Sequence, residues 1–184
     1  ILAAGQGKRM QSSLPKPLHQ VGGRPMLAWA LDAAKAANAH RIVTVLSPDS
    51  QTTQAWLGDQ EFAIQDPPLG TGHAVLAARD ILAGFEGVAL VMFADTPLVT
   101  SHTLARLVAR IANGDDIAVL GFETPEPTGY GRILCDDDGA VLKIVEERDA
   151  RPREKAITLV NGGIMAVRAP LVFEVLDQVN TAND

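Results

Sequence analysis

Apolar and polar positions alternate along the chain with two different periods. Short runs rich in Val, Ile, Leu and Phe predict strands. These runs lie at residues 1–2, 41–46, 62–64, 88–93 and 117–122. Apolar residues at helical spacing predict helices between them. These helices cover residues 25–37, 50–57, 72–82 and 101–111. A repeated strand–helix pattern is typical of a mostly parallel sheet with helices on both faces.

The pattern changes after Pro127. Two predicted strands, at 132–135 and 141–145, flank the sequence Asp-Asp-Asp-Gly at 136–139, which is a hairpin signal. A strand at 159–167 and a helix at 171–179 follow. The chain therefore predicts an α/β fold with a mixed, mostly parallel sheet and a hairpin insertion.

The length of 184 residues suits one sizeable core, so we expect a single domain over residues 1–184. The chain opens at Ile1 as though within a strand and ends at Asp184 without a stop signal, so we expect truncation at both ends. No apolar run approaches ~20 residues, and no membrane partner is expected. The single cysteine, Cys135, lies in a strand pattern, which favours a structural role over a catalytic one.

Charge is distributed unevenly along the chain, whose net charge is −6. Residues 1–31 contain Lys8, Arg9, Lys16 and Arg24 and no acidic residue, while all 22 acidic residues lie further along. A local positive field on an acidic protein favours a small anionic ligand and argues against nucleic acid.

Three polar or glycine-rich segments directly follow predicted strands, at 5–16, 65–71 and 95–97. Ligands of α/β sheets bind at the carboxyl ends of strands, so we expect these segments to converge. In the first segment, Met10 stands where a dinucleotide fingerprint needs Gly or Ala, and the P-loop glycine spacing is absent. The first segment is therefore predicted to be a phosphate-binding loop that carries cations and matches neither of these two motifs.

Two titratable residues each have two interpretations. Asp95 ends an apolar strand, where it could bind Mg²⁺ or cap the turn at Thr96 and Pro97. His73 could act as a general base, although a structural role in the first turn of its helix is favoured.

Several motifs occur in a fixed order: Leu-Ala-Ala-Gly-x-Gly-x-Arg-Met, Leu-Pro-Lys-x-Leu-His, Leu-Gly-Thr-Gly-His-Ala, Thr-Gly-Tyr-Gly-Arg-Ile and Ile-Val-Glu. With them the chain resembles, over essentially its whole length, the N-terminal uridylyltransferase domain of bacterial bifunctional N-acetylglucosamine-1-phosphate uridylyltransferase/glucosamine-1-phosphate acetyltransferases. The resemblance implies a Rossmann-like, GT-A-like nucleotidyltransferase fold. It also implies a cytoplasmic, Mg²⁺-dependent enzyme that makes UDP-N-acetylglucosamine and pyrophosphate from UTP and N-acetylglucosamine 1-phosphate, for peptidoglycan and lipopolysaccharide synthesis. The full-length enzyme would be a homotrimer through a C-terminal domain that is absent here.

The resemblance assigns roles to individual residues. Arg9 and Lys16 would hold the triphosphate, and Asp95 would bind Mg²⁺ together with an Asn beyond Asp184. Three residues would bind the amino sugar: Gly131, Glu146 and Asn161. The others would bind the nucleotide: Leu2, Ala3, Ala4, Gly5, Gln65, Gly70, Thr71, Phe93 and Ala94.

Three positions depart from the family's usual residues: Lys8 replaces Thr, Ala94 replaces Gly, and Gly162 replaces Thr or Ser. Two alternative functions stay open. One is another sugar-1-phosphate nucleotidyltransferase, and the other is a non-catalytic nucleotide-binding regulatory module.

Overall fold

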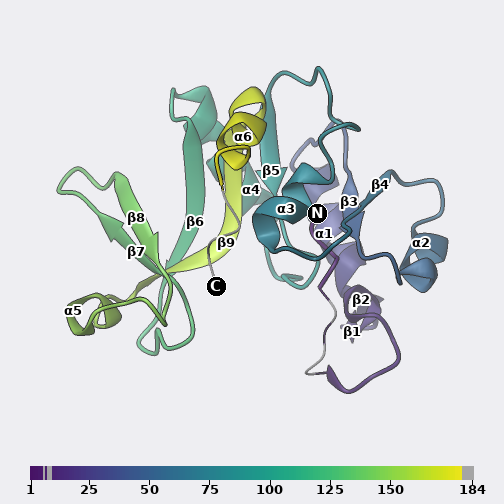
Figure 1. Ribbon diagram of the computed structural model, residues 1–184, viewed down its shortest axis with the longest axis horizontal. Helices are drawn as coiled ribbons and strands as arrows, with labels where there is room; N and C mark the ends of the chain where they lie inside the picture. Colours follow the sequence, from purple (N-terminus) through teal and green to yellow (C-terminus); the bar gives the residue numbers. More distant parts are fainter. Residues whose placement is uncertain (6, 8–9, 180–184) are drawn as a thin grey trace. The chain divides into compact units, whose positions relative to one another are not determined.

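The computed structural model describes residues 1–5, 7 and 10–179 (Figure 1). The chain divides into two compact units. Unit 1 comprises residues 1–118 and 166–184, and unit 2 comprises residues 119–165. The residues of two strands, β6 (Ile117–Glu123) and β9 (Leu159–Arg168), are shared between the units.

Unit 1 contains a parallel strand pair. β3 (Thr44–Leu46) pairs in parallel with β4 (Phe62–Ile64) in a two-stranded sheet, whereas β5 (Val88–Val91) lies next to β9 in a separate five-stranded sheet. Leu2 forms parallel bridges with Val45 and Phe93. Leu2 thus lies between β3 and the segment that follows β5.

Helices cover both faces of the sheet that contains β3. Val45 and Leu46 are neighbours on β3 and belong to different core clusters, because successive strand residues point to opposite faces. Leu46 packs with Leu27 and Leu31 of α1, while Val45 packs with Ala74 of α3. The helices of unit 1 are α1 (Met26–Ala36), α2 (Gln51–Leu57), α3 (Thr71–Leu76), α4 (Ser101–Ala112) and α6 (Ala169–Leu176). Among the described helices, none is long and apolar enough to cross a membrane.

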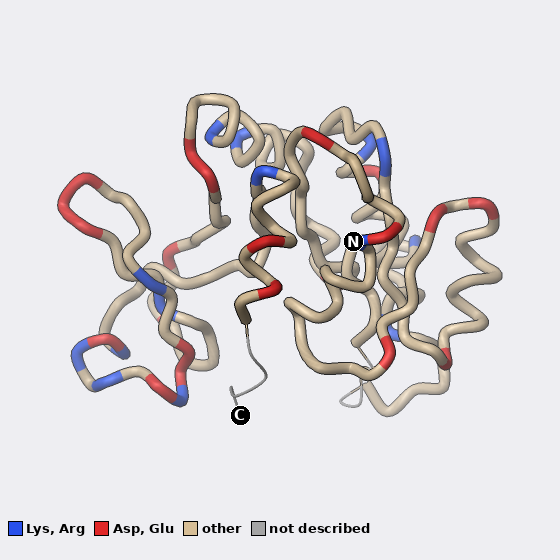
Figure 2. The backbone as a smooth tube through the Cα atoms, turned by 45° about the horizontal axis from the view of Figure 1, so that its top comes forward, with Lys and Arg blue, Asp and Glu red and all other residues tan. Residues whose placement is uncertain are grey.

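Unit 2 is built around an antiparallel arrangement. β7 (Arg132–Cys135) pairs antiparallel with β8 (Val141–Val145) and with β9. The acidic turn between β7 and β8 is closed by Asp136, whose Oδ1 accepts the Ala140 N–H at 2.8 Å. Figure 2 shows these acidic residues at the tip of the hairpin. The predicted hairpin insertion is confirmed, and a short helix, α5 (Pro152–Lys155), follows it.

Some local predictions were wrong. The helix expected at 72–82 ends at Leu76 because the chain tightens into turns, with the Arg79 N–H bonded to Leu76 O at 3.0 Å. Trp56 on α2 is 41% exposed, because this helix buries Thr53 and Leu57 instead. A hairpin of two-residue strands was missed, β1 (Gln20–Val21) and β2 (Arg24–Pro25), because such strands are too short to show a period.

Candidate functional site

A cavity of about 680 Å³ lies at the carboxyl edge of the parallel strands in unit 1. All of the described residues that were predicted to bind nucleotide, phosphate or Mg²⁺ line it. They are Leu2, Ala3, Ala4, Gly5, Lys16, Gln65, Gly70, Thr71, Phe93, Ala94 and Asp95. The three segments that follow strands therefore do converge. Their individual binding roles stay predictions, and Arg9 and Lys8 lie outside the described residues.

Small buried side chains form the inner wall of the cavity. Ala3, Ala4 and Ala94 are each at most 9% exposed. The backbone beside them is held by the sheet: Ala3 N–H donates to Val45 O at 2.8 Å, and Ala94 N–H donates to Leu2 O at 3.0 Å. The departure at Ala94 therefore adds a methyl group that is buried in the core. A flat ligand could approach this wall closely, because no large side chain projects from it.

Gln65 and the residues after it form a second wall. Gln65 is 4% exposed, and its Nε2 donates to Gly70 O at 2.9 Å. Gly70 has a φ of +98°, a conformation that favours glycine. His73 Nδ1 lies 3.5 Å from Gln65 Nε2. These contacts support the structural interpretation of His73, and they fix the orientation of the Gln65 carboxamide at the cavity.

A lysine and an aspartate form an ion pair in the cavity wall. Lys16 begins a 3₁₀ turn, η2 (Lys16–Leu18), which is anchored by buried Pro17 and Leu18. The Lys16 Nζ bonds Asp95 Oδ2, and the two side chains are 34% and 36% exposed. A cation and a carboxylate thus share one accessible edge of the cavity.

Gly7 makes room for Lys16. Its φ is +57°, and a Cβ placed on it would lie 2.8 Å from the Lys16 Cβ. A side chain at position 7 would therefore be strained and would displace the lysine. Sequence analysis did not predict this packing role of Gly7. The presence of a second glycine in the loop was the signal that could have indicated it.

The Asp95 carboxylate bonds Lys16, and its role as a metal ligand stays a prediction. The turn that follows is bonded through Thr96, whose Oγ1 donates to Phe93 O at 2.9 Å. The Asp95 carboxylate instead lines the cavity. Mg²⁺ commonly takes one or two protein carboxylates and completes its coordination with phosphates and water. Among residues 1–5, 7 and 10–179, no group of three or more His, Cys, Asp or Glu gathers. A single half-exposed carboxylate fits a metal that is held mainly by nucleotide phosphates.

The three predicted sugar-binding residues lie together in unit 2, and we call them the acceptor cluster. Asn161 N–H donates to Gly131 O at 2.8 Å, which joins β9 to the segment before β7. A Cβ on Gly131 would lie 3.0 Å from Glu146 Oε1, so Glu146 packs against the bare face of this glycine. Gly131 thus contacts both Glu146 and Asn161, while the role of the three residues in sugar binding stays a prediction.

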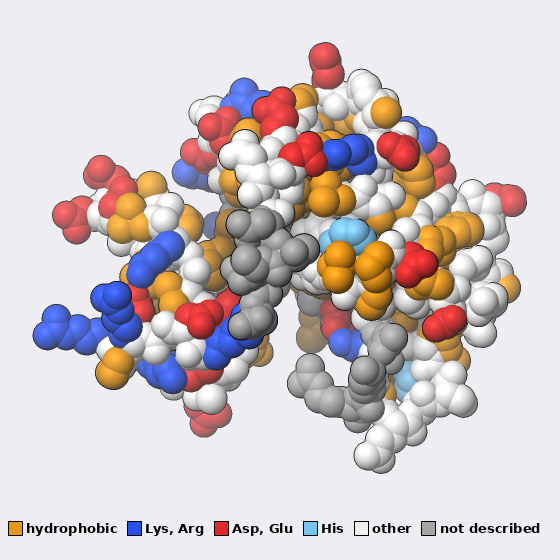
Figure 3. Space-filling model, viewed as in Figure 1, with side chains coloured by type: hydrophobic (Ala, Val, Ile, Leu, Met, Phe, Trp, Pro, Cys, Tyr) orange, Lys and Arg blue, Asp and Glu red, His pale blue; other side chains and the backbone are white. Residues whose placement is uncertain are grey.

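A buried arginine lies directly beside this cluster. Arg132 is 2% exposed, and its Nη2 is 2.6 Å from Glu147 Oε2. This hydrogen bond lowers the pKa of the Glu147 carboxyl below its usual value. The other Lys and Arg side chains of unit 2 gather on its surface around α5 (Figure 3). Sequence analysis missed Arg132, although a charged residue at the head of an apolar strand was a usable signal.

A cavity at the carboxyl edge of parallel strands is typical of ligand-binding α/β proteins. The chain belongs to the MobA-like NTP transferase domain family, whose sequence pattern matches residues 1–156. This family membership agrees with the expected nucleotidyltransferase fold.

The similar proteins are longer than this chain. The chain is 48% identical over 186 residues to the bifunctional protein GlmU of Maricaulis maris, and 44% identical over 187 residues to that of Hyphomonas neptunium. Both matches cover 100% of this chain but 41% of the relative. A UDP-glucose pyrophosphorylase of Acinetobacter baumanii has a similar fold, with a TM-score of 0.78 and 20% identity. That match covers 94% of this chain and 74% of the other. The resemblance found in the motifs is confirmed.

Proposed function

We propose that this chain transfers the uridylyl group of UTP to N-acetylglucosamine 1-phosphate and releases pyrophosphate. The observation that carries the proposal is the cavity of unit 1, which gathers every described residue predicted to bind the nucleotide. The identity to bifunctional GlmU proteins over the whole chain supports it. By the same resemblance, the product would supply peptidoglycan and lipopolysaccharide synthesis, and the full-length protein would be a homotrimer.

The proposed reaction needs no base to create its nucleophile. A phosphate oxygen of the sugar phosphate attacks the α-phosphorus of UTP, one P–O bond forms, and the bond to pyrophosphate breaks. The pyrophosphate leaves with the bonding electron pair. Since the attacking oxygen is already anionic, His73 can keep its structural contact with Gln65. The barrier lies in repulsion between anions and in the charge that develops on the phosphates.

Lys16 supplies a positive charge where this repulsion arises. Its ammonium group lines the cavity on a turn held by buried residues, so it can meet the phosphates without reorganising the backbone. Asp95 would hold Mg²⁺, which when bound neutralises phosphate charge and stabilises the leaving pyrophosphate. The Lys16 ammonium and the Asp95 carboxylate also form an ion pair with each other.

The acceptor cluster would bind the amino sugar. Glu146 is exposed and presents carboxylate oxygens, which suit sugar hydroxyl and amide N–H donors. Gly131 lets that carboxylate approach the backbone, and Asn161 is fixed by a bond from Gly163 N–H to its Oδ1 at 2.8 Å.

The test is pyrophosphate release by the full-length protein with UTP, N-acetylglucosamine 1-phosphate and Mg²⁺. Each nucleoside triphosphate and several sugar phosphates are compared under the same conditions. We expect the highest kcat/KM for UTP with N-acetylglucosamine 1-phosphate. A clear preference for glucose 1-phosphate would instead identify another sugar nucleotidyltransferase. Nucleotide binding without turnover of any pair would indicate a regulatory module.

A further inference from the structure

An ion pair in unit 2 is formed by the residues that directly follow two members of the acceptor cluster in sequence. Gly131 packs against Glu146, and the next residue in each segment, Arg132 and Glu147, forms the 2.6 Å ion pair. β7 and β8 are in register here, with Arg132 opposite Val145. Arg132 and Glu147 therefore form a diagonal pair across the antiparallel segments, and each adjoins a residue of the acceptor cluster in sequence.

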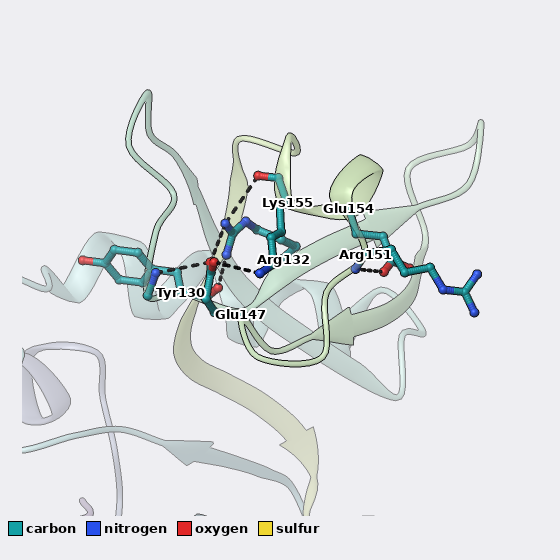
Figure 4. A network of polar contacts seen from close by, with 7 residues as sticks. Tyr130, Arg132, Glu147, Arg151, Glu154 and Lys155 are labelled. Atoms are coloured by element: carbon teal, nitrogen blue, oxygen red, sulfur yellow. Dashed lines mark hydrogen bonds and ion pairs between the residues drawn. The ribbon is translucent and has the colours of Figure 1, made fainter.

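Arg132 also bonds segments on both sides of this pair (Figure 4). Its Nη1 donates to Tyr130 O, and its Nη2 donates to Lys155 O at 3.4 Å. Glu147 in turn accepts the Gly129 N–H at 3.4 Å and lies 3.6 Å from Lys155 Nζ. The glycine-rich segment 128–131, the end of β8 and the end of α5 are thus joined through one guanidinium group. A planar group with five donors suits this arrangement, and lysine could not reproduce it.

We propose that Arg132 and Glu147 are positioning residues for the sugar-phosphate acceptor. They hold Gly131 against Glu146, so that the Glu146 carboxylate keeps one place and orientation. This inference rests on the proposed function, since it assumes that the acceptor cluster binds the sugar. Arg132 itself does not face the acceptor, because it is 2% exposed and its Nη1 and Nη2 donate to carbonyls within the protein, while its Nε has no partner among the described residues.

A positioning role and a purely structural role make different predictions. If the pair only stabilised unit 2, its loss would lower the melting temperature and leave the KM of each substrate unchanged. If it positions Glu146, its loss raises the KM for the acceptor selectively. Small misplacements of binding groups have large effects on bound geometry, so we expect an increase of about tenfold.

Glu147→Gln is the main variant, because it keeps the size of the side chain and one acceptor oxygen for Arg132. It is measured in the full-length protein by steady-state kinetics and by calorimetric titration with N-acetylglucosamine 1-phosphate. We expect the acceptor KM to rise about tenfold, the UTP KM to change less than twofold and the titrated acceptor affinity to fall in parallel. Glu147→Asp keeps the charge but shortens the side chain, and it replaces Glu147→Gln if that variant does not fold.

Lys143→Gln is the matched control. It removes the ion pair between Lys143 Nζ and Glu154 Oε1, which is 2.7 Å long, lies in the same unit and does not touch Glu147. We expect no change in either KM. An unchanged acceptor KM in the Glu147 variant, or equal increases for both substrates, would overturn the inference while wild-type turnover still supported the proposed function. A wild-type protein that neither turns over nor binds a sugar phosphate would overturn both.

Discussion

Unit 1 and unit 2 each contain an ion pair at a candidate binding region, and the two pairs differ in exposure. Lys16 and Asp95 are about equally exposed, at 34% and 36%, and both line the cavity. Arg132 is 2% exposed, and only its partner Glu147, at 31%, meets solvent. An exposed pair contributes little to stability and opens at low cost, whereas separating a buried pair leaves a charge without compensation.

This difference indicates two uses of the same interaction. Under the proposed function, Lys16 would leave Asp95 to contact a phosphate, and Asp95 would leave Lys16 to bind a metal ion. Arg132 has no such freedom, because its guanidinium already bonds carbonyl groups of two segments. In this proposal the first pair would bind the substrate, and the second would hold other residues that bind it.

The largest expected effect comes from Asp95→Asn. The amide is a poorer ligand for a hard cation, and it removes the charge that would hold Mg²⁺. We expect turnover to fall by about 10³-fold and to need a higher Mg²⁺ concentration for its half-maximal rate. Pyrophosphate release across a Mg²⁺ titration measures this.

Asp32→Asn is the control for that variant. Asp32 also forms an ion pair, at 2.6 Å with Arg24, and is 52% exposed, but it does not line the cavity. If Asp95→Asn keeps the Mg²⁺ dependence of the wild type, Asp95 is not the metal ligand and the contrast between the two pairs fails.

A somewhat smaller effect is expected for Lys16→Ala. Loss of a preorganised charge at the phosphates should cost about 3 kcal/mol in the transition state, or roughly 150-fold in kcat/KM. The fold should survive because the lost ion pair is exposed, and circular dichroism would check this. Arg41→Ala, which removes the exposed pair with Glu61, should retain full activity. Near-normal turnover of Lys16→Ala would exclude the proposed role.

The sequence predicted the residues that line the cavity of unit 1 better than the contacts of Arg132 in unit 2. Strand ends and glycine segments are visible as local patterns, so the convergence of Gly5, Gln65 and Asp95 followed from topology alone. Arg132 donates to the backbone carbonyls of Tyr130 and Lys155. Every residue has such a carbonyl, so the residue types do not reveal which ones accept these bonds. The contact between Gly7 and Lys16 was hidden for a related reason, since it depends on a turn conformation.

Glu146→Ala tests the acceptor cluster directly. The loss of a charged hydrogen-bond acceptor should cost about 1.5–3 kcal/mol in sugar binding, which raises the acceptor KM ten- to a hundredfold. The UTP KM should stay within twofold of the wild type. Glu126→Ala removes another exposed carboxylate of unit 2 and should change neither value. An unaltered acceptor KM in Glu146→Ala would remove Glu146 from the sugar site.

The smallest expected effect concerns Gly162, which follows Asn161 on β9. A Cβ at this position would lie 2.9 Å from Leu120 O on β6, and a backbone carbonyl cannot yield as a flexible side chain does. We therefore expect Gly162→Ala to destabilise the protein by about 1 kcal/mol or more in urea unfolding. Gly5→Ala is the stability control, because outside its chain neighbours no described atom lies within 4 Å of its added Cβ.

Since any shift of β9 also moves Asn161, the acceptor KM of Gly162→Ala should rise while the UTP KM does not. Equal stability of Gly162→Ala and the wild type would show that β6 and β9 can separate freely, and the scaffold of unit 2 would then be less rigid than its buried arginine implies.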